Sequence, residues 1–500
     1  MTCQLPTDCL NDIFEYLEED KFTLHSCLLA NHLWCEISVR ILWRNIWNFN
    51  YQQRSSRVAS SILSTLIACL PDESKKLLCD NKIFISTPTS KPLLFNYASF
   101  CKALSIYEIK WMINSIFKNK PSINLLSSKD KNILVANEII KMFANQIFSL
   151  RKLTYHPYYY HGQYIYTSIS FSHFPGARDL LELCCSSSLP SDFFHQLSQI
   201  CHNLQSISIS FDDYVSNELK ELISSQNNLK KLSLSAFEKS WADIIPAITK
   251  HSHTITKLQL YGGNEELPLS FISLFSNLQE FLFSFFDGTG FEDFRMLQYI
   301  KFSKLQVLKI PYQCPNPQYM MKFLENNGKT LKKFYTDENN KDLSLSIAKF
   351  CPNLKSLFVI LNNGEIDILK TIFISCQYLE SIKIWCGKGY FSEFLSEKEV
   401  LETVAKYSPN NFCELKIYNI SKSDLSPDDL ESFFISWEER TPKKLLSIII
   451  IVDDEDRYYN NTSSETLEII GKYEDLGTIK FLTKSDDKEK EEEEEDHYCG

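Results

Sequence analysis

The chain has 500 residues, of which 44% are hydrophobic and 13% aromatic, and its formal net charge is −11. This length exceeds one ordinary hydrophobic core, so we expect several domains or one elongated repeat architecture. Residues 486–496 (DDKEKEEEEED) hold nine acids and two lysines, a net of −7, which leaves −4 for the rest of the chain. That balance gives no argument for nucleic-acid binding, and no apolar run approaches the ~18 residues of a membrane span.

The sixteen cysteines include no CxxC pair. The first thirty residues carry six acidic side chains, which is unlike a secretory signal. We therefore predict reduced thiols and a location in the cytoplasm, the nucleus or both.

Residues 5–46 predict three short amphipathic helices. Pro6 suits a first helical turn, and Asp8 places negative charge near the positive end of that helix. An apolar stripe follows at i, i+3, i+4 and i+7 spacing, formed by Leu10, Ile13, Phe14 and Leu17. A segment of roughly 40 residues buries too little surface to enclose so many large apolar groups. We expect it to dock on the rest of the chain or on a partner.

This segment resembles the F-box family in several fixed spacings. The matching residues are the Leu-Pro opening, the apolar helix, a Ser-Cys-Leu in the middle, a Trp and a closing Leu-Trp: Leu5, Pro6, Leu10, Ile13, Phe14, Leu17, Ser26, Cys27, Leu28, Trp34, Leu42 and Trp43. The Val-Cys-Arg of many F-boxes reads Leu29-Ala30-Asn31 here. The resemblance implies binding of a Skp-type adaptor and, through it, a cullin–RING ubiquitin ligase. It names as adaptor contacts Leu5, Pro6, Leu10, Ile13, Phe14, Leu17, Trp34, Leu42 and Trp43. An ordinary helical cap on a larger fold is the alternative.

Residues 48–148 show helical patterns without a strand signal, so we expect a helical connector that seals the first edge of the next domain. From residue 149 a different pattern recurs, apolar-x-x-apolar-x-apolar, at intervals of 23 to 33 residues. Its thirteen instances begin at Leu150, Leu180, Leu204, Leu229, Ile255, Leu278, Leu305, Leu331, Leu354, Leu379, Phe412, Leu445 and Leu476. The alternation inside each instance predicts a strand with one buried side.

Between these strands lie helical stretches with Ser or Asp at their starts, such as Ser396 and Ser426. One strand and one helix per ~25 residues resembles the leucine-rich repeat. Cys201, Cys351 and Cys376 each precede a leading Leu by three residues, which resembles the cysteine-containing subtype of F-box proteins with such repeats. We predict an α/β solenoid with parallel strands on the concave face and helices outside. A doubly wound α/β enzyme is the weaker alternative, because no glycine-rich turn follows any strand.

No pattern predicts a catalytic, metal or cofactor site. Gly328-Lys329-Thr330 echoes a phosphate-binding loop, but Phe323 stands where that loop needs a glycine. His251 and His253 have no flanking ligands, so we expect exposed loop histidines rather than a zinc site. No cysteine lies in a basic cluster that would activate it as a nucleophile. Trp385 and the other tryptophans of the repeats are expected to be core residues.

Lysines recur at strand positions that should point to the concave face. They are Lys152, Lys231, Lys257, Lys309, Lys333, Lys383, Lys416 and Lys480, against Glu182, Glu280 and Glu414. They either keep the sheet solvated or form a groove for an acidic or phosphorylated target segment, most clearly through the first seven. The acidic C-terminal block is either solvated or folds back on this face in competition with targets.

The sequence predicts four parts: an F-box (1–47), a helical connector (48–148), a solenoid of about thirteen repeats (149–483) and a disordered acidic tail (484–500). The expected function is that of a non-catalytic substrate receptor of an SCF-type ubiquitin ligase. Its F-box would bind the adaptor and its repeats an unidentified protein target. The alternative is an interaction scaffold that acts outside ubiquitination.

Overall fold

The computed structural model describes most of the chain, with gaps. The described residues are 5–47, 56–84, 93–117, 128–156, 158–160, 163–165, 174–237, 239–263, 267–285, 293–389, 393–421, 423, 425–442, 444–452 and 464–485. The acidic block predicted as a disordered tail lies outside them from residue 486 onward. The chain divides into two compact units, Met1–Leu229 and Lys230–Tyr498. This boundary falls inside the predicted repeat region rather than between connector and repeats.

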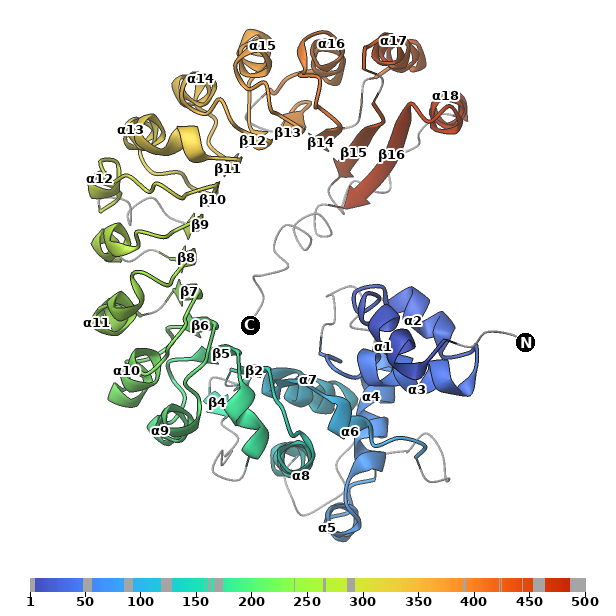
Figure 1. Cartoon of the computed structure of the whole chain (residues 1–500), viewed down its shortest axis with the longest axis vertical. Coiled ribbons are helices and arrows are strands. Elements are labelled where there is room, and N and C mark those ends of the chain that lie inside the picture. Colours follow the sequence, from blue (N-terminus) through green and yellow to red (C-terminus); the bar gives the residue numbers. More distant parts are fainter. Residues whose placement is uncertain are drawn as a thin grey trace. The chain divides into compact units, whose positions relative to one another are not determined.

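The first unit begins with helices and ends with strand–helix repeats (Figure 1). Its helices are α1 (Thr7–Glu15), α2 (Lys21–Cys27), α3 (His32–Leu42), α4 (Ser56–Cys69), α5 (Asp72–Asp80), α6 (Tyr97–Phe100), α7 (Ile106–Phe117), α8 (Ser128–Gln146), η3 (Pro175–Asp179), α9 (Ser191–Ile200) and α10 (Asn217–Ser224). Its parallel strands run in the order β1 (Ala103–Ser105), β2 (Lys152–Tyr155), β5 (Glu182–Ser186) and β6 (Ser206–Ser210). A separate antiparallel pair joins β3 (Tyr158–Tyr160) and β4 (Gln163–Ile165).

Local capping explains where the three N-terminal helices start. The Asp20 carboxylate accepts a hydrogen bond from the backbone N–H of Thr23 at 3.0 Å and so caps α2. The Asn31 side chain accepts from the N–H of Trp34 at 3.0 Å and caps α3 in the same way. Pro6 stands directly before α1, where its missing N–H costs nothing.

The segment after α3 is fixed to the first edge of the sheet. The Arg44 carbonyl accepts hydrogen bonds from the N–H groups of Lys102 and Ala103, at 2.8 and 3.1 Å. Before β2, the Lys102 carbonyl accepts two hydrogen bonds in the same manner. The Arg44 carbonyl therefore bonds to the start of β1 in the way that the residue before one strand of this sheet bonds to the start of the next strand. The Trp47 indole N–H donates to the Ala103 carbonyl at 2.6 Å. The connector, predicted to hold only helices, therefore contributes β1 to the sheet.

The second unit is a row of parallel strands, and each strand from β7 to β15 is followed by a helical segment. The strands lie in chain order: β7 (Lys231–Ala236), β8 (Lys257–Gly262), β9 (Glu280–Phe285), β10 (Val307–Ile310), β11 (Lys333–Thr336), β12 (Ser356–Val359), β13 (Ser381–Cys386), β14 (Glu414–Asn419), β15 (Leu446–Val452) and β16 (Ile479–Ser485). Strand β16 thus extends two residues past the expected end of the solenoid. The strands line the inner side of the curve and the helices its outer side (Figure 1).

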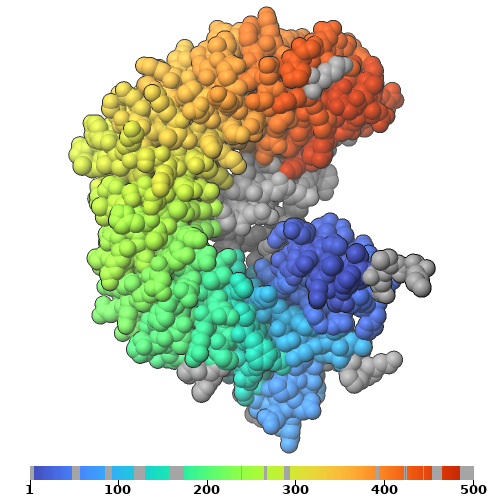
Figure 2. Space-filling model, viewed as in Figure 1, coloured from blue at the N-terminus to red at the C-terminus, as the bar shows by residue number. Residues whose placement is uncertain are grey.

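The helical segments of the second unit lengthen along the chain. They are η4 (Ala242–Ile244), α11 (Ile245–Ile248), η5 (Thr249–His251), η6 (Ser270–Leu274), α12 (Phe294–Leu297), α13 (Pro317–Asn327), η8 (Gly328–Thr330), α14 (Lys341–Phe350), α15 (Ile366–Ser375), α16 (Glu397–Tyr407), α17 (Pro427–Glu438) and α18 (Ser464–Asp475). In the space-filling view the repeats of this unit from yellow to red form a continuous surface (Figure 2). The predicted α/β solenoid with leucine-rich-repeat geometry is confirmed by this strand–helix order and parallel pairing.

The leading apolar residues set the strand positions. Strands begin two residues after eleven of the thirteen predicted starts, and those eleven leading side chains are buried. The last two differ, because Leu445 is 52% and Leu476 is 59% exposed. In these repeats the inward apolar residues are Leu446 and Ile479 instead. The assignment of Leu445 and Leu476 as buried leading residues was therefore wrong, although both strands form.

Side chains at the ends of some helices bond to the preceding repeat. The Asn327 amide accepts from the Phe302 N–H at 2.7 Å and donates to the Ile300 carbonyl at 2.9 Å. The Cys201 thiol donates to the Ala177 carbonyl at 2.9 Å. Cys351 and Cys376 are likewise buried at this position. Cys184, expected to be a reduced core residue, is disulfide-bonded.

Candidate partner-binding surfaces

The three N-terminal helices share a small core. Its buried members are Leu10, Phe14, Leu24, Cys27, Ile37 and Ile41, with Leu17, Leu33, Trp34 and Leu42 packed against it. The rings of Phe14 and Trp34 meet edge to face at 5.3 Å between centroids. Of the predicted apolar stripe, Leu10, Phe14 and Leu17 thus pack within the segment, whereas Ile13 does not.

The nine predicted adaptor contacts divide into three groups. Leu10 and Phe14 lie inside the helical core, so their effect on any partner is through the fold. Leu17, Trp34, Leu42 and Trp43 are half-buried, and Trp43 packs on Tyr97 of the connector at 4.6 Å between ring centroids. Leu5, Pro6 and Ile13 are exposed. Of the nine residues, only these last three offer largely exposed side chains.

Three more large apolar side chains on this segment are exposed and were missed from the sequence. Tyr16 is 91%, Phe22 is 88% and Leu29 is 89% exposed. We call the five residues Leu5, Ile13, Tyr16, Phe22 and Leu29 the N-terminal apolar surface. The i, i+3 spacing of Ile13 and Tyr16 could have indicated that they share one side of α1. Ile13 was placed in the same stripe as Leu10 and Phe14, so the exposed side of the helix was not recognised.

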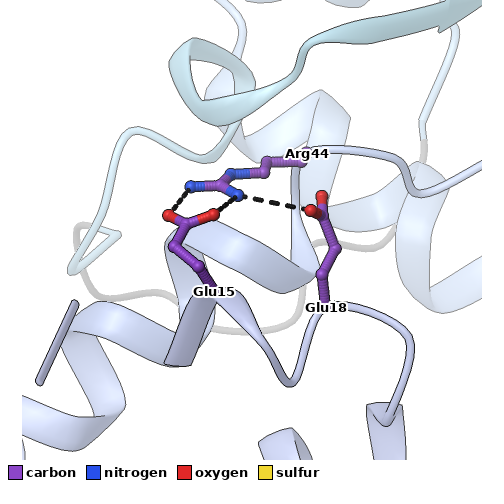
Figure 3. A network of polar contacts seen from close by, with 3 residues as sticks. All are labelled: Glu15, Glu18 and Arg44. Atoms are coloured by element: carbon purple, nitrogen blue, oxygen red, sulfur yellow. Dashed lines mark hydrogen bonds and ion pairs between the residues drawn. The ribbon is translucent and has the colours of Figure 1, made fainter. Parts of the chain in front are cut away.

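Arg44, which follows α3, makes polar contacts with Glu15 and Glu18 at the end of α1 and just after it (Figure 3). Its guanidinium donates to both carboxylate oxygens of Glu15 at 2.5 Å and lies 3.6 Å from the Glu18 carboxylate. These hydrogen bonds lower the pKa of Glu15 and raise that of Arg44. Since the Arg44 carbonyl also holds β1, one residue links the end of α1 to the sheet edge.

The strand face opposite the helices of the second unit, its concave face, carries side chains in register. One row crosses it, formed by Lys231, Lys257, Glu280, Val307, Lys333, Ser356, Ser381, Glu414, Ser447 and Lys480. A second row lies two residues further along, with Lys309, Tyr335, Phe358, Lys383 and Lys416 in register. The predicted lysines of this unit therefore do share one face.

The predicted lysines differ in their surroundings. Lys257 pairs with Glu280 at 3.2 Å, and in the first unit Lys152 pairs with Glu182 at 3.4 Å. Lys333 and Lys480 are exposed, whereas Lys231, Lys309 and Lys416 are half-buried. Lys383 is only 6% exposed, with its ammonium 5.3 Å from the Phe358 ring centroid and 5.7 Å from that of Tyr335. It is held among aromatic rings rather than presented on an open lysine row.

Two further expectations from the sequence need correction. His251 is buried rather than an exposed loop histidine, and its carbonyl accepts the Thr254 and Ile255 N–H groups. Trp385 is only half-buried and packs against a small core cluster of Phe358, Ile360 and Phe394, in contrast to Trp241, which is fully buried. Trp385 lies two residues after Lys383 on the same strand, so the two side chains point to the same face. This spacing could have indicated that Trp385 lies on the concave face.

The thiols of the repeat cysteines are held protonated. Burial raises the pKa of Cys185, Cys201 and Cys376 to about 12, so none is activated as a nucleophile at neutral pH. Among the described residues there is no cluster of three His, Cys, Asp or Glu side chains placed to hold a metal ion. Nor does any described helix combine the length and the apolar character needed to cross a bilayer.

Comparison with known proteins adds little beyond this geometry. No protein-family model matches the chain, and no curated protein matches it. Among solved structures, a chain of the complex of Rad7 and Elc1 in yeast is similar, with 16% sequence identity and a TM-score of 0.35. The match covers 55% of the present chain and 76% of the chain in that complex. A leucine-rich-repeat protein of Leptospira interrogans matches 60% and 76%, with 14% identity and a TM-score of 0.29. At these TM-scores neither likeness carries an argument about this chain.

Proposed function

We propose that this protein is a non-enzymatic target receptor of an SCF-type cullin–RING ubiquitin ligase. Its N-terminal helices act as an F-box that binds a Skp-type adaptor, and through the adaptor a cullin. Its repeats bind the protein to be modified. The resemblance of residues 5–43 to the F-box suggests this class of partner.

The N-terminal apolar surface is the observation that supports the proposal. Each large apolar side chain left in water forgoes about 1.5–3 kcal/mol relative to burial. Five such side chains stay largely exposed within 25 residues, from Leu5 to Leu29, although the segment has its own core. Several large exposed apolar groups on one short folded segment are typical of an interaction site. An adaptor that covers them would recover this free energy on binding.

The junction between the helices and the sheet suits a receptor that works by proximity. Ubiquitin transfer needs no chemistry from the receptor, only a target held near the ubiquitin-carrying enzyme. The Arg44 carbonyl and the Trp47 indole both bond to the segment that forms β1. In the first unit the proposed adaptor surface is therefore attached to the repeats by direct hydrogen bonds, which would hold the two at a set separation.

The test is co-purification of the full chain with a Skp-type adaptor and a cullin. We test two double variants, Tyr16→Ser/Phe22→Ser and Leu5→Ala/Pro6→Ala. Each should co-purify with at least about tenfold less adaptor than the wild type, a loss of binding free energy of ~1.4 kcal/mol. Circular dichroism should stay unchanged. A matched control is Ile374→Ser/Tyr378→Ser, which removes two exposed apolar groups of the second unit, 62% and 57% exposed. Equal adaptor retention by all variants would contradict the F-box assignment.

A different result would favour the scaffold alternative. If the wild-type chain co-purifies with a ligand of its repeats but never with adaptor or cullin, it acts outside a ligase. Ubiquitination assays with the reconstituted complex then separate the two functions, because only a ligase receptor increases ubiquitin transfer to its bound target.

A further inference from the structure

A continuous patch of aromatic rings lies on the concave face of the second unit. Tyr335 and Phe358, on β11 and β12, have ring centroids 4.4 Å apart. Trp385 and Tyr418, on β13 and β14, stack at 5.1 Å with an interplanar angle of 25°. Phe358 and Trp385 join the two pairs at 6.4 Å. We call these four residues the aromatic patch.

The aromatic patch surrounds a small buried cluster of its own. Phe358 is only 3% exposed and packs with Ile360 and Phe394, and the partly buried Tyr335 and Trp385 pack against them. In each of these strands the alternate residues Phe334, Leu357, Ile382 and Leu415 are almost fully buried, which leaves the opposite side to the patch. Tyr335, Trp385 and Tyr418 are half-buried, and Phe394 covers one edge of Trp385 at 5.5 Å. Aromatic side chains at such density on a strand face are more typical of a binding surface than of a solvated sheet.

Lysines determine which ligand this surface favours. The Lys383 ammonium already lies over the faces of Phe358 and Tyr335, where a cationic ligand would otherwise bind. Lys309 is in register with Tyr335, and Lys416 is in register with Lys383. A ligand therefore meets rings and positive charge together, which disfavours cations and favours an acidic group beside an apolar one.

We propose that the aromatic patch and Lys383 bind a peptide segment of the target in which an apolar side chain stands next to an acidic group. This assignment rests on the proposed function, because it identifies the part of the repeats that holds the target. The apolar side chain packs on Trp385 and Tyr418. The acidic group, a carboxylate or a phosphate, faces the lysines.

Peptide selection on the full chain tests this proposal. We expect a displayed library of random peptides to yield binders with an aromatic or aliphatic residue beside Asp or Glu. Trp385→Ala should weaken their binding at least about tenfold, as for an aromatic anchor worth ~1.4 kcal/mol or more. Lys383→Met, which keeps most of the buried stem, should remove the preference for acidic residues. Replacing the acids by phosphoserine tells whether phosphate binds better than carboxylate.

Controls separate this site from the rest of the molecule. Lys231→Glu on β7 should change peptide affinity less than about twofold if the site is local. The proposal would be overturned if the selected peptides were basic or if no peptide bound. It would also be overturned if Trp385→Ala, with an unchanged circular dichroism spectrum, bound the peptides as tightly as the wild type. If peptides bind only after removal of residues 486–500, the occupant is the chain's own acidic end and not a target. The variant Leu5→Ala/Pro6→Ala should bind peptides normally, so loss of the adaptor interaction is distinguishable.

Discussion

The N-terminal helices and the repeats of the second unit use their large apolar residues differently. The helices bury six residues in a small core and leave Tyr16, Phe22 and Leu29 almost fully exposed. The repeats bury their leading residues in stacked layers, and their exposed apolar groups are spread over separate helices, such as Met296, Ile374 and Ile435. A repeat has a neighbour on each side to cover its apolar face, whereas a short three-helix segment does not. The difference shows where large apolar side chains stay exposed, which is the segment proposed to bind the adaptor.

The largest expected effect is loss of a core side chain from the repeats. Trp241 is fully buried, its indole N–H donates to the Pro268 carbonyl at 2.9 Å, and its ring meets Phe285 edge to face. We expect Trp241→Ala to lower the free energy of unfolding by about 3–5 kcal/mol, because it leaves a cavity. Urea denaturation followed by circular dichroism measures this. A loss near zero would mean that repeat stacking does not carry the stability of this unit.

Close stacking of neighbouring repeats gives the next effect. A Cβ at Gly328 would lie 2.6 Å from the Phe350 carbonyl oxygen and 2.8 Å from the Cys351 sulfur. Gly328→Ala should cost about 1–3 kcal/mol, since backbone cannot easily move aside. The control is Gly471→Ala in α18, where nothing lies within 4 Å of the added carbon. That change should stabilise by about 0.5–1 kcal/mol through helix propensity. Equal effects of the two substitutions would contradict the stacking.

In the N-terminal helices a polar network supplements the small core. The Arg44 side chain, 18% exposed, bonds to Glu15 and approaches Glu18. We expect Arg44→Met to lower the free energy of unfolding by about 1–2 kcal/mol. Arg40→Met, which removes an exposed pair with Glu36 on one helix, should cost only about 0.3–0.5 kcal/mol. Similar losses in thermal melts would show that the Arg44 network is no more than a surface ion pair.

The same network predicts a pH dependence. Hydrogen bonds from Arg44 lower the pKa of Glu15, so its contribution to stability is present above the pKa of the unfolded chain. It is lost as the pH falls through the lower pKa of the folded state. Melting temperatures compared between about pH 7 and about pH 3 should fall less steeply for Arg44→Met than for the wild type. Parallel pH profiles would refute the coupling.

The smallest effect on stability is expected at the exposed groups of the proposed adaptor surface. Phe22 is 88% exposed, so Phe22→Ser should change the free energy of unfolding by less than about 0.5 kcal/mol. Denaturation of the purified chain in the absence of any adaptor measures this. A loss of more than ~1 kcal/mol would show that Phe22 packs in solution, and the contrast with the repeats would disappear.

The repeat architecture was predictable because each strand depends on a local pattern. A leading apolar residue and strict alternation place Lys231 and Lys257 on one face and Leu232 and Leu258 on the other, whatever the neighbours are. The prediction of a leading residue was wrong at Leu445 and Leu476. Another apolar residue follows each of these leucines, Leu446 after Leu445 and Ile479 after Leu476. The sequence alone does not decide which residue of each pair is buried. Strand β1 was missed because its three residues lie between two helical patterns.

The sequence by itself determined the strand–helix period, the parity of the concave lysines and the amphipathic character of the first three helices. These properties depend on spacing along one segment, which the chain carries in its own order. Only the tertiary structure decided that Arg44 continues the sheet edge, that Lys383 is held by Tyr335 and Phe358, and that Trp385 is only half-buried. Each of these depends on residues far apart in sequence, and their contact free energy exists only once neighbouring repeats have stacked.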